Sequence, residues 1–167
     1  MNIQPLIMMM YNYYSGDSHQ IQHFIKVHSF ARQIGIMENL DEITQEILEI
    51  SAIVHDIGIK NSMEKYGSGD GKYQELEGPP EAMKMLTKLK YPQNIIDRVC
   101  YLVGHHHTYN EIEGMDYQIL VEADFLVNIH ESNMDAGSIK SVIRKIFKTS
   151  TGIQICKRMF KVEESPQ

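Results

Sequence analysis

The chain has 167 residues, of which 43% are hydrophobic and 23% charged. These values are typical of one globular domain and exclude disordered, collagen-like and low-complexity proteins. The formal net charge of -6 argues against a general nucleic-acid binder, and eight His beside two Cys favour imidazole and carboxylate chemistry over disulfides or thiolate zinc sites.

Residues 1–16 are expected to form an N-terminal helix that packs on the domain. Their apolar run is short and no Lys or Arg precedes it, unlike a secretory signal. No stretch of the chain approaches the ~18 apolar residues of a membrane span. With its Cys expected to be free, we expect a cytoplasmic protein that has no membrane partner.

Helical periods dominate the next part of the chain. Residues 17–36 carry apolar side chains at steps of three and four, and a second such pattern follows the N-cap candidate Asp41 and stops at Gly58. Residues 59–78 lose this period and contain four glycines. They are predicted to form a flexible loop of about 20 residues, a candidate active-site lid.

The helical pattern is expected to resume with Pro79 and Pro80 in the first turn of a helix. Pro92 is expected to open another helix, which ends near residues 105–107. Residues 116–130 are apolar almost all round, which predicts a helix buried in the middle of the domain.

Two amphipathic helices, at 137–148 and 150–161, are expected to precede a frayed tail. No repeat, linker or strand pattern interrupts the sequence. The fold class is therefore predicted to be all-α, one domain overall, with a core at 17–132 and C-terminal helices and tail at 133–167.

The candidate site starts from Asp124, which lies in the apolar run ILVEADFLV. A buried carboxylate costs several kcal/mol unless it is paired or binds a cation, although an Arg, a cap or water usually satisfies a single one. His55 and Asp56 end an apolar helix, where the partial negative charge of the helix terminus favours a cation. The alternative is a His that caps carbonyl groups beside a solvated Asp.

His23 flanks the apolar stripe of its helix, a position where a lone His is usually a core residue. Three helices that each present His or Asp at one inner boundary favour a shared site instead. His23, His55, Asp56 and Asp124 would form a site of two His and two carboxylates. Such a site suits an octahedral Mn, Fe, Co, Ni, Zn or Mg ion.

Three sequence pieces resemble the HD-domain superfamily of metal-dependent phosphohydrolases. They are His23 with Val27, VHDIGIK at 54–60 and EADFLV at 122–127, and the resemblance runs from about residue 17 to about residue 132. It implies an HD-type helical bundle with His23, His55, Asp56 and Asp124 as metal ligands. It also implies hydrolysis of a phosphomonoester or phosphodiester by a metal-bound water, with a small phosphorylated substrate, a nucleotide among the candidates.

The sequence departs from the dinuclear members of this superfamily. Where they carry a further His, this chain has Gln74, a poor ligand, and the nearby carboxylates of Glu75 and Glu77 could substitute for it at a second metal or substrate site. The dinuclear members also carry one or two His near the end of the next helix. These are matched here by His105, His106 and His107, of which His106 is expected to point inward. We expect one divalent ion per chain, with a second site incomplete or weak.

The resemblance also suggests roles at the site. Asp56 would orient or deprotonate the nucleophile, and His106 or His107 would protonate the leaving oxygen or contact phosphate. Lys60 would neutralise phosphate charge or equally be a solvated lysine, and His19 is a candidate substrate contact.

Two alternatives stay open. One is a diiron oxygenase of HD-type fold, which would need a complete second site. The other is a non-catalytic sensor that binds a nucleotide or metal. The sequence does not predict the substrate, the metal or the oligomeric state.

Overall fold

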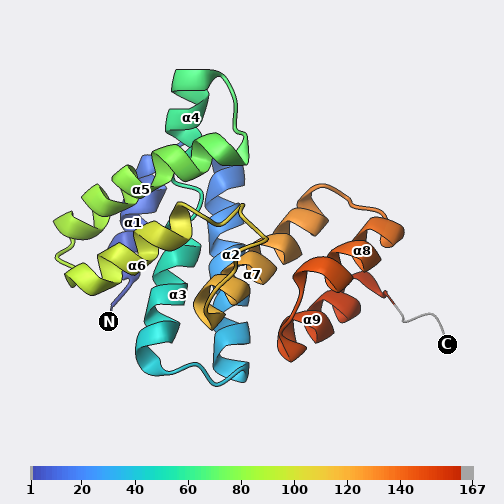
Figure 1. The fold of residues 1–167 in the computed structure, drawn as a ribbon. Helices are drawn as coiled ribbons and strands as arrows, with labels where there is room; N and C mark the ends of the chain where they lie inside the picture. The colour runs from blue at the N-terminus through green and yellow to red at the C-terminus, as the bar shows by residue number, and fades with distance from the viewer. Residues whose placement is uncertain (1, 163–167) are drawn as a thin grey trace.

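In a computed structural model of the chain, residues 2–162 form nine α-helices and contain no strand (Figure 1). The segment at 104–114, between the sixth and seventh helices, is the longest connection within this part of the chain. The helices are α1 Gln4–Tyr13, α2 Ser18–Met37, α3 Glu42–Val54, α4 Ile59–Tyr66, α5 Gly71–Lys88, α6 Gln93–Val103, α7 Met115–Glu131, α8 Ala136–Ile146 and α9 Ser150–Phe160. The all-α single-domain prediction is confirmed. The predicted frayed tail lies outside the described residues from position 163 onward.

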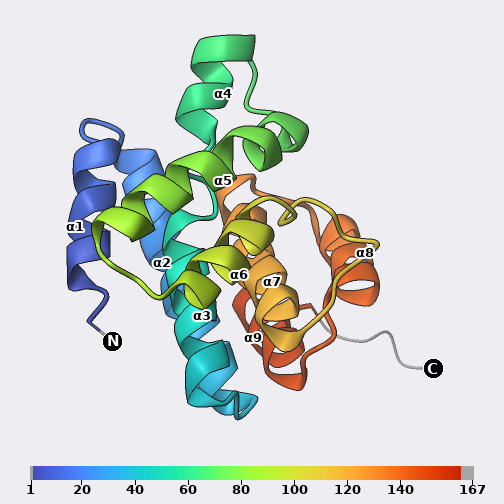
Figure 2. The ribbon, with the colours of Figure 1, turned by 60° about the vertical axis from the view of Figure 1, so that its left-hand side comes forward.

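Helices α2, α3 and α7 form the centre of the bundle. α2 packs against both α3 and α7, while α5 and α6 lie against each other on one side and α8 and α9 lie on the other (Figures 1 and 2). α7 is buried along most of its length, as its nearly continuous apolar sequence predicts. No helix within residues 2–162 is long and apolar enough to cross a membrane.

The N-caps follow the chemistry of their side chains. Asp17 accepts a hydrogen bond from the Gln20 amide, and Asp41 accepts from the amides of Ile43 and Thr44. A carboxylate in this position satisfies amides that have no partner inside the helix. The predicted cap at Asp41 is confirmed.

The prediction of a 20-residue loop at 59–78 is wrong. α4 stands away from the body of the molecule and turns back through residues 67–70 into α5 (Figures 1 and 2). The rings of Tyr66 and Tyr73 stack with centroids 4.2 Å apart, and Glu77 accepts hydrogen bonds from Lys65 and Tyr66. These contacts are polar or aromatic. α4 and the first half of α5 therefore carry no apolar period that the sequence could reveal.

The prediction that Pro79 and Pro80 occupy a first turn is also wrong. They lie inside α5, where each lacks the amide that would bond to the carbonyl four residues earlier. The first half of α5 packs closely on the turn after α3, since a Cβ on Gly58 would lie 2.5 Å from the Gln74 carbonyl oxygen and 2.7 Å from the Gly78 nitrogen. Two of the four glycines in the predicted loop also permit close packing, since a Cβ on Gly71 would lie 2.7 Å from His107 and one on Gly78 2.6 Å from Val103.

Candidate metal centre

Four side chains from three segments converge inside the bundle. His23 belongs to α2, His55 and Asp56 to the turn that follows α3, and Asp124 to the buried middle of α7. They meet because α2 packs against both α3 and α7. All four residues are less than a tenth exposed.

The donor atoms of these residues are spaced like ligands around one ion. His23 Nε2 lies 3.1 Å from Asp124 Oδ1, 3.3 Å from Asp56 Oδ2 and 3.3 Å from His55 Nε2. His55 Nε2 lies 3.5 Å from both carboxylate oxygens. Metal–donor bonds of about 2.1 Å place neighbouring ligands of an octahedron about 3 Å apart. The four residues therefore fit a divalent ion.

Hydrogen bonds on the far side of the rings fix which imidazole nitrogen carries the proton. His55 Nδ1 lies 3.0 Å from the Ala52 carbonyl oxygen, and His106 Nδ1 lies 2.8 Å from that of Val103. A carbonyl oxygen only accepts, so each Nδ1 donates, and the neutral ring then presents a lone pair at Nε2. This is the tautomer that an Nε2 metal ligand requires.

His23 is oriented by a carboxylate that the sequence analysis did not single out. Its Nδ1 donates to Glu131 Oε2 at 2.9 Å, and Lys26 holds the other oxygen of Glu131 at 2.7 Å. Glu131 lies seven residues after Asp124, two turns along the same face of α7. This spacing of seven residues is the signal by which the sequence could have identified Glu131. A carboxylate behind a His ligand fixes its ring and makes it a stronger donor.

The electrostatics of the cluster favour a positive charge at its centre. Burial disfavours the charged imidazolium of His23, but the hydrogen bond to Asp124 and the charges of Asp56 and Asp124 outweigh it and raise its pKa to about 9. Burial likewise opposes ionisation of Asp56 and Asp124, yet neighbouring imidazoles keep the pKa of both carboxyls low. Two ionised carboxylates in the interior thus call for a cation.

A second group of donors shares Asp56 with the first. It contains His106 and His107, and its three ligand atoms lie within 4.8 Å of one another, as do those of His23, His55 and Asp56. His106 Nε2 is buried without a hydrogen-bond partner, 3.4 Å from Asp56 Oδ1. His106 thus points inward, toward the same carboxylate.

His107 is engaged by Gln74. The Gln74 side-chain nitrogen donates to the Gly69 carbonyl at 2.6 Å, so its oxygen faces His107 Nε2 at 3.2 Å. Burial first, and then the charge of His106, lower the pKa of His107 to about 4, so its ring is neutral. Since the Gln74 oxygen can only accept, His107 Nε2 carries the proton and offers no lone pair to a metal. The second group therefore lacks one of its three donors in this arrangement.

The remaining candidates lie elsewhere. His105 stacks on Tyr101, with centroids 4.2 Å apart, and its Nδ1 bonds to the Tyr101 carbonyl. Lys60 is exposed, with its ammonium 5.2 Å from the centroid of the Tyr13 ring. The Glu77 carboxylate is taken by Lys65 and Tyr66.

Two more candidates lie nearer the centre. Glu75 accepts from the His107 amide and the Thr108 hydroxyl. His19 is exposed at the rim, with its Nε2 3.5 Å from Glu131 Oε2.

The centre opens into a cavity of about 170 Å³. Its lining includes His23, Asp56 and Asp124, together with His19, Gln20, Ile59, Gln74, His107, Asn128 and Glu131. A second polar cavity of about 430 Å³ shares His19 and Glu131 with it. The site therefore has room for a small molecule beside the metal centre.

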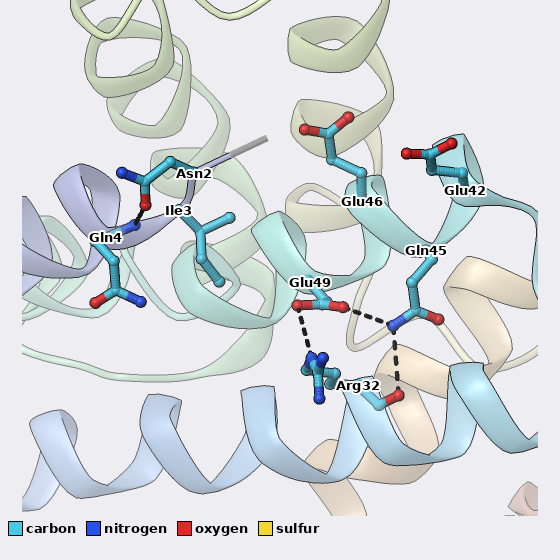
Figure 3. A pocket seen from close by; sticks show the side chains of 8 residues that line it. All are labelled: Asn2, Ile3, Gln4, Arg32, Glu42, Gln45, Glu46 and Glu49. Carbon is cyan, nitrogen blue, oxygen red and sulfur yellow. Dashed lines mark hydrogen bonds and ion pairs between the residues drawn. The ribbon is translucent and has the colours of Figure 1, made fainter.

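A third cavity, of about 380 Å³, lies between α1, α2 and α3 (Figure 3). It carries Glu42, Glu46 and Glu49 beside Arg32, whose Nε lies 3.6 Å from Glu49 Oε2. Gln45 donates to Glu49 at 2.8 Å and, more weakly, to the Arg32 carbonyl (Figure 3).

Comparisons with known proteins agree on the fold. The family model of the HD domain matches residues 21–147. A crystal structure described as a predicted HD superfamily hydrolase, from an uncultured Thermotogales bacterium, has a TM-score of 0.68 and 19% sequence identity, covering 96% of this chain and 92% of that chain. No curated protein matches the sequence.

Proposed function

Because the chain belongs to the HD domain family, whose superfamily comprises metal-dependent hydrolases, we propose that it hydrolyses a phosphomonoester or a phosphodiester with one divalent ion. His23, His55, Asp56 and Asp124 would hold that ion. The observation that carries the proposal is the convergence of two imidazole nitrogens and two carboxylate oxygens at 3.1–3.5 Å. A bound divalent ion would polarise a phosphoryl oxygen and lower the pKa of a water.

The other side chains at the centre supply proton transfer and orientation. Asp56 would accept a hydrogen bond from the attacking water and orient it, since its carboxyl stays ionised. Burial disfavours a charged His106, but the neighbouring carboxylates of Asp56, 3.4 Å away, and of Asp124 outweigh it and raise its pKa. His106 could thus carry a proton to the leaving oxygen. The Nε2–H of His107 donates to Gln74 here and would have to exchange that partner to reach a phosphoryl oxygen.

The cavities support a small substrate. The volume beside the donors is about 170 Å³, which suits a phosphoryl group, and the adjoining polar cavity offers space for the leaving group. We propose a small phosphorylated compound as substrate, with a nucleotide among the candidates, and a cytoplasmic location in keeping with two free cysteines.

The proposal is tested by metal analysis and turnover in the same preparations. Purified protein should carry close to one divalent ion per chain and hydrolyse members of a phosphoester panel when supplied with Mn, Co or Ni. His55→Ala should lose both properties. His28→Ala is the matched control, because His28 bonds to Glu49 at 3.2 Å, away from the centre.

Each alternative function has its own signature in this experiment. Two irons per chain with O₂ consumption would favour an oxygenase, which the engagement of His107 by Gln74 argues against. Tight nucleotide binding without turnover under every metal would favour a sensor. Absence of bound metal, with equal metal uptake by His55→Ala, would overturn the proposal.

A further inference from the structure

Two neighbouring tyrosines at the end of α1 reach the turn that carries the metal-binding residues. Tyr13 is the last residue of α1 and Tyr14 follows it. Both precede residues 21–147, the part that matches the HD domain. Their role is therefore a property of this chain beyond the matched segment.

The hydroxyl groups of the tyrosines donate to two successive main-chain carbonyls. Tyr14 Oη lies 2.7 Å from the carbonyl oxygen of Asp56, and Tyr13 Oη lies 3.1 Å from that of Ile57. Tyr14 is buried and Tyr13 half-buried. Burial first, and then the charge of Asp56, raise the pKa of Tyr14, so its hydroxyl keeps the proton that it donates.

α1 is itself firmly placed. Leu6 and Met10 are fully buried, and the helix contacts α3 and α5 (Figure 2). The rings of Tyr13 and Tyr14 meet edge to face, with centroids 5.0 Å apart. The two hydroxyls are therefore presented from a rigid support.

The turn at 55–58 is closed by two main-chain hydrogen bonds, from the Ile57 amide to the Val54 carbonyl and from the Ile59 amide to the Asp56 carbonyl, and Tyr14 adds a second donor to the Asp56 carbonyl. The turn follows the end of α3, where carbonyl groups lose their intrahelical partners. Asp56 belongs to both groups of metal-binding donors, with Oδ2 facing His23 and His55 and Oδ1 facing His106. A shift of the Asp56 main chain would move one oxygen away from each side at once.

We propose that Tyr14, assisted by Tyr13, is a positioning residue that fixes the main chain of Asp56 and thereby the geometry of the metal centre. This inference rests on the metal-binding part of the proposed function and not on the reaction. Neither tyrosine touches the metal donors directly; each acts through a carbonyl of the turn.

The test compares Tyr14→Phe, Tyr13→Phe and the double variant with the wild type. Each change removes one hydroxyl and keeps the ring. Tyr11→Phe is the matched control, since Tyr11 lies on the same helix, packs on Phe24, and its hydroxyl has no hydrogen bond recorded among residues 2–162. The probe is Co²⁺, followed by calorimetric titration and by its visible absorption, which reports the ligand geometry.

Mutation of a residue that hydrogen-bonds to a metal ligand typically lowers the metal affinity 10–100-fold. We expect Tyr14→Phe to weaken Co²⁺ binding about tenfold and to alter the absorption bands, Tyr13→Phe to weaken it about threefold, and Tyr11→Phe to leave it unchanged. Unchanged affinity and spectrum in Tyr14→Phe, with only a loss of metal-free stability, would overturn the inference. If Tyr14→Phe does not fold, Tyr13→Phe decides by the same criteria.

The outcomes separate this inference from the proposed function. Wild-type protein that binds Co²⁺ and responds to Tyr14→Phe, yet hydrolyses no phosphoester, would support positioning and count against hydrolysis. Wild-type protein that binds no Co²⁺ would overturn both.

Discussion

Two clusters in this protein both bring carboxylates and His side chains together. They differ in the groups that face the carboxylates. In the cavity between α1, α2 and α3, Glu49 is met by Arg32 and by the Gln45 amide (Figure 3). His28, which does not line the cavity, lies with its Nε2 3.2 Å from Glu49 Oε2. Glu49 thus meets a cation and hydrogen-bond donors. At the candidate metal centre, Asp56 and Asp124 meet imidazole nitrogens, and His55 Nδ1 donates outward to a main-chain carbonyl.

The comparison teaches that a count of acidic and basic groups does not identify a cation site. The Glu49 carboxylate needs no further cation, because it meets an arginine and hydrogen-bond donors. The candidate metal centre holds two buried carboxylates beside a protonated His23, whose Nε2 proton a divalent ion would displace. The predictions below probe this difference, starting with the largest expected effect.

Asp124→Asn should abolish stoichiometric metal binding and lower kcat/KM at least about 1,000-fold, because a bound metal supplies several kcal/mol of transition-state stabilisation. The side chain keeps its shape and loses its charge. Elemental analysis and phosphoester turnover measure the two effects. Glu49→Gln, the same kind of change in the other cluster, should retain metal and activity; equal losses in both variants would erase the distinction.

Removal of metal should lower the thermal stability of the wild type. A ligand at 100 times its Kd contributes about 2.7 kcal/mol, which corresponds to about 5–10 °C in Tm for a chain of this size. Differential scanning calorimetry before and after chelation measures the shift, and added Mn²⁺ should reverse it. Asp124→Asn should show no shift, whereas a shift that persists there would place the stabilising ion elsewhere.

Glu131→Gln should weaken metal binding about 10–100-fold without abolishing it, because Glu131 only orients His23 and strengthens it as a donor. Titration with Co²⁺ gives the affinity. Glu49→Gln again provides the control, since Glu49 also contacts a His side chain. If Glu131→Gln bound metal as tightly as the wild type, the carboxylate behind His23 would serve only to hold Lys26.

The smallest expected effect is a pH dependence of the folding stability, and it comes from His28 beside Glu49. Burial lowers the pKa of His28 despite its contact with Glu49. The unfolded chain, with a His pKa near 6.5, therefore takes up this proton first as pH falls. This part of the stability is present above about pH 6.5 and is lost as pH falls below it.

Urea unfolding at pH 7.5 and 5.5 measures that loss, and His28→Gln should reduce it while leaving metal content at pH 7.5 unchanged. A wild type and variant with the same pH dependence would remove His28 as its source.

The sequence predicts the central part of the fold and the four converging residues for one reason. The four residues are polar groups that interrupt or end otherwise apolar helical stretches, and such an interruption is visible in a sequence. They are His23, His55, Asp56 and Asp124. α7 is equally visible because its apolar residues run all round the helix.

The remaining features depend on contacts that leave no periodic trace. Residues 59–78 form helices held by Tyr66, Tyr73 and Glu77, whose polar and aromatic contacts resemble those of a loop. The proton on His107 depends on how Gln74 is turned, and that is set by the Gly69 carbonyl. Glu131 had a helical signal, two turns from Asp124, whereas the tyrosines of α1 had none.

The metal centre also constrains the order of events when the protein is made. His23 and Asp124, whose side chains lie 3.1 Å apart, are separated by 101 positions along the chain. During synthesis the first three donors leave the ribosome long before α7 exists, at about 5–20 residues per second. The full donor set is assembled only when α7 packs on α2 and α3, so an ion held by all four donors would be captured late in folding.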